Sequence, residues 1–115
     1  MAGYTNAAKD IGLDAIGAAG TWISAHTADP GQTGANEVNG GTYARVQTTW
    51  SAAAGSSKAG TQVTLNIPAG VTITHWGVWS ANSAGTFYES EPLAAQESYG
   101  SAGTYLLTPT LTASG

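Results

Sequence analysis

The chain has 115 residues, of which only 9% are charged, and its formal net charge is −4. Its three basic residues lie far apart in the sequence and it has no cysteine, which argues against nucleic-acid binding and excludes disulfides and thiolate metal sites. No apolar run approaches the roughly 20 residues of a membrane span, so we expect one globular domain over residues 1–115 that binds no membrane.

Residues 1–20 form the only plausible helical segment. The helix is predicted over residues 5–19, with Thr5 or Asn6 as its N-cap. Apolar residues at helical spacing predict one packed stripe: Ala8, Ile11, Ala15 and Ile16. The acidic Asp10 and the lack of a basic start do not fit a signal peptide. We therefore expect synthesis and assembly in a host bacterial cytoplasm.

Beyond residue 20 the apolar period changes to two, which is typical of strands. Strands are predicted over residues 21–26, 43–50, 62–67, 71–80, 86–90, 93–98 and 104–112. Alternation in the fourth of these places Ile73, His75 and Trp79 on one face, and Trp76 and Val78 on the other. Residues 51–60 are predicted to be a flexible connector. Seven short strands with Gly-rich turns indicate an all-β fold: one antiparallel β-sandwich, jelly-roll or immunoglobulin-like, with a short N-terminal helix.

A long loop rich in Gly and Asn is predicted over residues 27–42. Asp29 begins a turn sequence in which its carboxylate accepts backbone hydrogen bonds. This explanation is favoured over a metal site formed by His26, Asp29 and Glu37. The glycines match neither phosphate-binding pattern, GxGxxG or GxxxxGK[ST].

Catalytic groups are sparse. His26 and His75 both lie in predicted strands, where a packed core histidine is more common than a catalytic base. Glu89 and Glu91 share one strand face at a separation of about 7 Å, close to that of glycosidase carboxylates, but so short a chain offers little cleft. We therefore expect no enzyme activity and no cofactor.

Aromatic residues allow two interpretations. Trp22, Trp50, Trp76, Trp79 and Tyr88 could form a sugar-stacking platform, but aromatic side chains equally enrich protein cores and interfaces. Use in the core and at interfaces is favoured.

The stretch WISAHTADPGQTGANEVNGGTYAR, residues 22–45, closely resembles a motif of the form SLHTADPGTTGANEVTGGSYAR. That motif recurs in small structural proteins of tailed bacteriophages, described as minor tail or tail-fibre proteins. The resemblance continues through VTITHWGVWSANSAGTFYESEPLAAQESYGSAGTYLLTP and runs from about residue 6 to residue 112. It implies a location in the virion and assembly into symmetric oligomers, and it supplies no catalytic residues.

We therefore expect a virion structural protein: a small surface subunit that decorates or cements the capsid, or a minor tail or tail-fibre adaptor. A carbohydrate- or receptor-binding tail module is the alternative. Its expected partners are copies of itself in a homotrimer and other virion proteins, such as the major capsid or tail proteins. The predicted interface residues are Asp29, Pro30, Gly31, Asn36, Glu37, Tyr43, Arg45, Trp50, Trp76 and Trp79.

Overall fold

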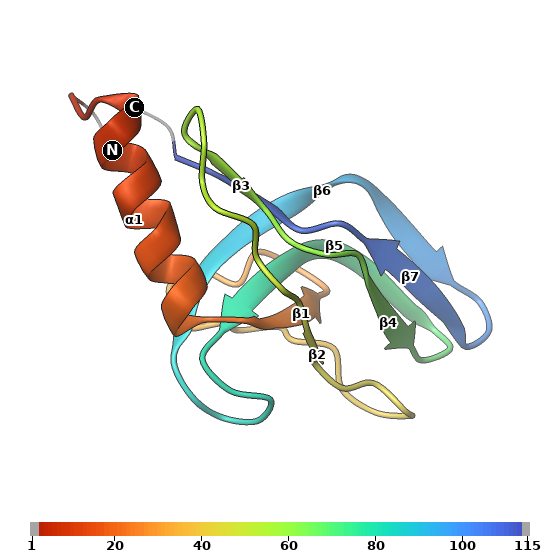
Figure 1. Ribbon diagram of the computed structural model, residues 1–115. Coiled ribbons are helices and arrows are strands. Elements are labelled where there is room, and N and C mark those ends of the chain that lie inside the picture. Colours follow the sequence, from red (N-terminus) through yellow and green to blue (C-terminus); the bar gives the residue numbers. More distant parts are fainter. Residues whose placement is uncertain (1–2, 114–115) are drawn as a thin grey trace.

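The computed structural model describes residues 3–113, which form one helix followed by eight strands (Figure 1). The elements are α1 (Asn6–Ala19), β1 (Trp22–His26), β2 (Val46–Gln47), β3 (Ser57–Ala59), β4 (Val63–Ile67), β5 (Val71–Trp79), β6 (Phe87–Tyr99), β7 (Gly103–Leu107) and β8 (Thr110–Thr112). All strand pairs are antiparallel, so the predicted all-β fold with a short N-terminal helix is confirmed. Met1 and Ala2 of the predicted helical segment lie outside the described residues.

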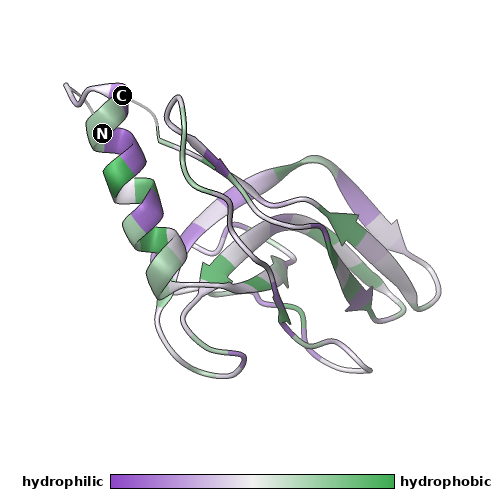
Figure 2. Cartoon of the chain, in the orientation of Figure 1, coloured by the Kyte–Doolittle hydropathy of each residue, from purple (hydrophilic) through white to green (hydrophobic). Residues whose placement is uncertain are grey.

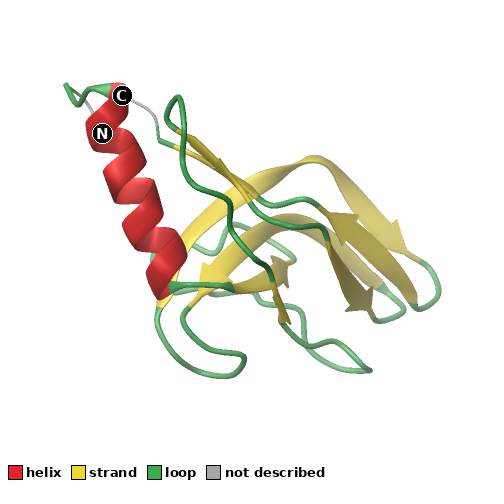
Figure 3. Cartoon of the chain, in the orientation of Figure 1, coloured by secondary structure: helices red, strands yellow, loops and turns green. Residues whose placement is uncertain are grey.

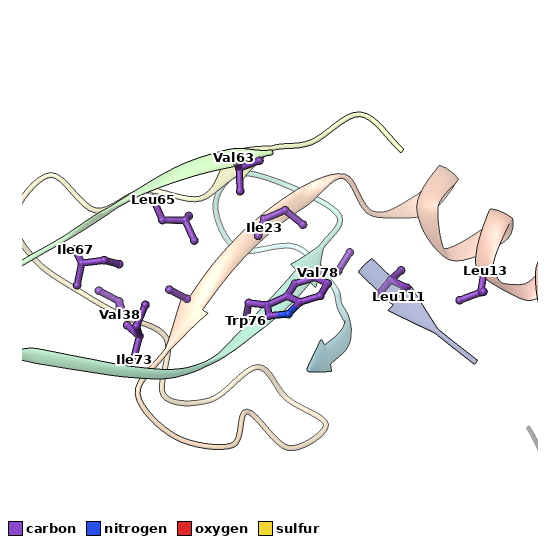
Figure 4. Packing of buried hydrophobic residues seen from close by; sticks show 11 residues of the cluster. Leu13, Ile23, Val38, Val63, Leu65, Ile67, Ile73, Trp76, Val78 and Leu111 are labelled. Carbon is purple, nitrogen blue, oxygen red and sulfur yellow. The ribbon is translucent and has the colours of Figure 1, made fainter. Parts of the chain in front are cut away.

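Two layers of strands enclose the core. One is a four-stranded sheet in the order β2-β1-β5-β6, and the ladders β4–β7 and β3–β8 form the other (Figure 3). Apolar and polar residues alternate along β4, and only the apolar ones are buried (Figure 2). Figure 4 shows Val63 and Leu65 of β4 on the side that faces Ile23 of β1, while Ile67 lies beside Val38 and Ile73. This arrangement is compatible with the predicted β-sandwich.

The helix begins where the sequence predicts, but its packed face includes only part of the predicted stripe: Ile16 contacts the core, whereas Ala15 is exposed. The Thr5 hydroxyl caps it by accepting a hydrogen bond from the Ala8 N–H. Leu13 and Gly17 are its buried residues, whereas Ile11 of the predicted stripe is 72% exposed. A side chain at Gly17 would overlap Lys58 and contact Trp50, so this glycine permits the close approach. None of the helical structure within residues 3–113 has the length and apolar character needed to cross a membrane.

The prediction of a flexible connector at residues 51–60 was wrong. This segment contains β3, which pairs with β8. Two helix carboxylates hold it: Asp10 accepts from the Ser56 N–H at 2.7 Å, and Asp14 binds Lys58 Nζ at 2.6 Å. The hydrogen bond from Lys58, followed by that from the Ala53 N–H, lowers the pKa of Asp14. Local composition could not show this anchoring, because its partners are more than 40 residues away in sequence.

Four strand predictions need correction. Only β2 forms within the strand predicted over residues 43–50. The strands predicted over residues 86–90 and 93–98 are one continuous strand, β6. The strand predicted over residues 104–112 divides near Pro109, because β7 pairs with β4 while β8 pairs with β3.

A bulge reverses the side-chain alternation of β5. Ile73 pairs with Glu97 of β6, but His75 pairs with Pro92, so the register shifts between them. Ile73 consequently shares the core with Trp76 and Val78, so the prediction that it lies on the face of His75 and Trp79 was wrong. The predicted division of Trp76 and Val78 from Trp79 is confirmed. Trp79 lies on the opposite face of the sheet from Val78, and it is still buried.

We predict that Leu65→Ala lowers the free energy of unfolding by about 2–5 kcal/mol, because it leaves a cavity in the core. Leu65 is 1% exposed. Urea denaturation measures the change. The matched control is Leu106→Ala on the neighbouring β7: Leu106 is 59% exposed, and its loss should cost no more than about 0.5 kcal/mol. Equal losses for both variants would contradict this assignment of the core.

Candidate functional site

Residues 27–45 of the motif, which we call the motif layer, lie largely over the outer face of the four-stranded sheet, and Val38 within them is buried in the core. The segment 27–45, between β1 and β2, covers Trp79 and Phe87, whose rings meet edge to face at 5.1 Å. Gly34 lies directly on the Trp79 indole with φ +75°, and a Cβ at this position would overlap the ring. The predicted long loop is therefore folded against its own domain.

Arg45 is the centre of a polar cluster in this layer, which also includes Glu37 and Tyr43. Its guanidinium forms a bidentate ion pair with Glu37, with N–O distances of 2.8 and 2.9 Å, and lies 3.6 Å from the centre of the Trp79 ring. Its Nη1 donates to the carbonyl oxygens of Ala81 and Ala84 at 3.0 and 2.8 Å. Ala84 has the unfavourable φ of +54°, so the Arg45 bond helps to hold a strained turn.

Glu37 and Tyr43 are the other members of this polar cluster. The Tyr43 hydroxyl donates to Glu37 at 2.7 Å and accepts from the Ala25 N–H at 3.0 Å. Burial alone would raise the pKa of Glu37, but the hydrogen bonds from Arg45 and Tyr43 outweigh it and hold that pKa below its usual value. Burial raises the pKa of Tyr43. Glu37 is therefore an anion and Tyr43 a neutral donor at neutral pH.

Ser24 and His26 form a buried pair that resembles a nucleophile and its base. Ser24 Oγ lies 2.7 Å from His26 Nε2, but both residues are 0% exposed. His26 Nδ1 must carry the proton, because its partner at 2.8 Å is the carbonyl of Ala35. The Ser24 hydroxyl then donates to Nε2 and accepts from the Trp79 indole at 2.9 Å. The pair thus holds the loop through the Ala35 carbonyl. The only sequence signal for this pair is that Ser24 and His26 share one face of the predicted strand.

The three residues considered as metal ligands, His26, Asp29 and Glu37, form other interactions in the structure. Asp29 Oδ1 accepts from the Gly31 N–H at 2.9 Å, which confirms the turn interpretation. His26 has both ring nitrogens bonded, and Glu37 is bound by Arg45 and Tyr43. Within residues 3–113, no three His, Asp or Glu side chains are placed to hold a metal ion.

The remaining catalytic candidates lie apart from the motif layer. His75 is half-buried, and its Nδ1 is 2.8 Å from the Thr74 hydroxyl. Glu89 and Glu91 lie on β6 beside a cleft of about 350 Å³, which Leu13 and Ile16 of α1 also line. Burial, and then repulsion by Glu89, raises the pKa of Glu91. Glu89 and Glu91 therefore line a surface cleft, and no histidine is among the residues that line it.

The aromatic side chains do not form one exposed platform. Trp76 and Trp79 are 4% and 8% exposed. Trp50 is half-buried and donates from its indole to the Gly20 carbonyl at 2.8 Å. Trp22 of β1 is half-buried, and Tyr88 of β6 is 41% exposed. The burial of Trp76 and Trp79 agrees with the favoured interpretation of the sequence.

The predicted interface residues divide into two groups. Asp29, Gly31 and Asn36 are exposed on the loop, where a contact with another molecule stays a prediction. The side chains of the others are buried or half-buried within this chain: Pro30, Glu37, Tyr43, Arg45, Trp50, Trp76 and Trp79. Their main use is therefore inside the domain.

Comparison with known proteins gives one family. The model of the family described as podophage GP4 fiber I protein gp80 matches residues 14–112. This range includes the motif layer and all eight strands. No curated protein matches the chain.

We predict that Arg45→Ala lowers the free energy of unfolding by about 3–5 kcal/mol, because it leaves the Glu37 carboxylate partly buried without its partner. Adding Glu37→Gln to this variant should recover part of the loss. Urea denaturation of Arg45→Ala, Glu37→Gln and the double variant measures the coupling. Lys9→Ala is the control, since Lys9 forms no ion pair among the described residues. Strictly additive effects of the two substitutions on the free energy of unfolding would contradict an energetic coupling between Arg45 and Glu37.

We also predict that stability falls as the pH drops below 6.5. Burial is the main cause that lowers the pKa of His26 from 6.5. The unfolded chain therefore takes up this proton at a higher pH than the folded protein, and unfolding is favoured as the pH falls. The carboxylates whose pKa is lowered, Asp14 and Glu37, lose their contribution only below about pH 4.5, while the raised pKa of Glu91 acts in the opposite direction.

Denaturation midpoints measured across this pH range test the assignment. The His26→Gln variant should have a lower stability at all pH values but a flatter slope around pH 6. The His75→Gln control should keep the slope, because the buried ring at position 26 is still present. An unchanged slope in His26→Gln would show that another group is responsible.

Proposed function

The chain belongs to the family described as podophage GP4 fiber I protein gp80, and on that premise we propose that it is a non-enzymatic structural subunit of the phage fibre. In this proposal it works by binding its neighbours in the virion. The fibre is favoured over the capsid shell as its location, because the family description names a fibre protein.

The observation that carries this proposal is the state of the motif residues. The side chains that could perform chemistry are already bonded to one another: Ser24 to His26, and Glu37 to Arg45 and Tyr43. Ser24 and His26 are also fully buried. Polar groups that are bonded to one another in this way stabilise the fold of the chain. A stable fold of this kind suits a protein that acts by binding its neighbours.

The shape and surface support attachment to neighbours. The molecule is elongated, with extents of 44 × 24 × 23 Å. Large apolar side chains are exposed on both the helix and the strands, among them Ile11 at 72% and Leu106 at 59%. Burying such side chains between subunits is favourable. We propose that copies of the chain associate, as a homotrimer, and that the trimer contacts other fibre proteins.

Immunogold labelling of intact virions tests this function. An antibody against the chain should label the fibres, and light scattering of the purified protein should give the mass of a trimer. Label on the capsid shell would contradict the fibre location, and absence of the protein from particles would contradict a structural role. A monomer at high concentration would contradict the trimer alone.

A further inference from the structure

The outer edge of β6 is an unpaired strand edge. β6 is the last strand of the four-stranded sheet, and within residues 3–113 no strand pairs with its outer side. In its first part Glu89, Ser90 and Glu91 lie opposite Val78, Gly77 and Trp76 in regular register, and a second register shift precedes them, between Phe87 and Glu89. An edge of this kind presents free N–H and C=O groups that can pair with another chain.

The free edge is confined to the first half of the strand. Pro92 has no N–H to donate, and the register shift that follows it leaves the residues before Glu97 without regular partners in β5. These features protect the second half of β6 from pairing. The segment available for pairing is therefore Phe87–Glu91.

Two clefts flank this segment, one on each face. The first, of about 350 Å³, is lined by Leu13 and Ile16 of α1 together with Glu89 and Glu91. The second, of about 390 Å³, is lined by Gly31 and Gln32 of the loop together with Phe87, Tyr88, Glu89 and Ser90. Because strand side chains alternate between faces, a strand added here would direct its residues into the two clefts in turn.

The charge distribution selects the partner. Two of the three basic residues are used inside the domain, since Arg45 pairs with Glu37 and Lys58 with Asp14. Five of the seven carboxylates are left outside these ion pairs, and three of the five lie on β6: Glu89, Glu91 and Glu97. A second copy paired along this edge would bring carboxylates against carboxylates, which is unfavourable. A cationic segment is attracted instead.

We propose that Phe87–Glu91 binds an extended, cationic segment of a partner protein by strand addition. Main-chain hydrogen bonds to β6 supply the pairing. Lys or Arg side chains at alternate positions enter the first cleft, where their methylene groups pack on Leu13 and Ile16 while their charges reach Glu89 and Glu91. A cation there also relieves the repulsion that contributes to the raised pKa of Glu91.

The proposed binding site does not depend on the fibre location or on the trimer, so each of these proposals can be tested separately. It depends only on the free edge, the two clefts and the local charge. The partner is defined by its chemistry: an extended backbone with alternating basic side chains.

The test is an NMR titration of the isotope-labelled chain with a short peptide in which Lys alternates with Val. Shifts should map to the amides of Phe87–Glu91, and the counterpart peptide with Glu in place of Lys should not bind. The double variant Glu89→Gln/Glu91→Gln should weaken binding by about tenfold. The matched control Glu97→Gln, on the irregular half of the same strand, should leave the affinity nearly unchanged.

A second peptide separates strand addition from simple charge attraction. It carries N-methyl groups on the amides that would face β6, so it keeps every charge but cannot complete the ladder. Strand addition predicts that it does not bind. Equal binding of the methylated peptide, shifts that map elsewhere, or no binding of the Lys peptide would each overturn the proposal.

Discussion

The Arg45 guanidinium holds the outer half of the molecule together. A long loop with few apolar residues cannot be held to a sheet by hydrophobic burial, so it needs directed polar bonds. Arg45 supplies them to Glu37 and to the carbonyl groups of Ala81 and Ala84 while its plane covers Trp79. Burying a charge is costly, and this array of bonds offsets the cost because it satisfies both members of the ion pair.

This arrangement also determines where the protein can interact. Since Arg45 and Lys58 are neutralised inside the domain, the net negative charge is carried at the surface, and much of it lies along β6. Residues 27–45 thus help to build the scaffold. In our proposals the free edge of β6 and the exposed apolar side chains contact neighbours, so folding and attachment use different residues.

Some parts of the fold could be predicted because their signals are local. The alternation of Val63, Leu65 and Ile67 identifies β4 and its buried face, and Thr5 marks the start of α1. Other parts could not be predicted. β3 lies in a stretch of small and polar residues, and its stability comes from β8 and from carboxylates on α1. The packed face of α1 was predicted only in part: Ile16 contacts the core, but Gly17 marks a close approach that apolar periodicity does not detect.

The class of fold, the family resemblance and the loop between β1 and β2 follow from the amino-acid order alone, because apolar period and turn chemistry depend on residues close together in the chain. The roles of the motif residues follow from contacts between distant parts of the chain. Ser24 meets Trp79 across 55 positions, and Arg45 meets Ala81 across 36. The bulge in β5 places Trp79 beneath the loop and Trp76 in the core. Such pairings depend on strand register, which is set by all the strands packing together.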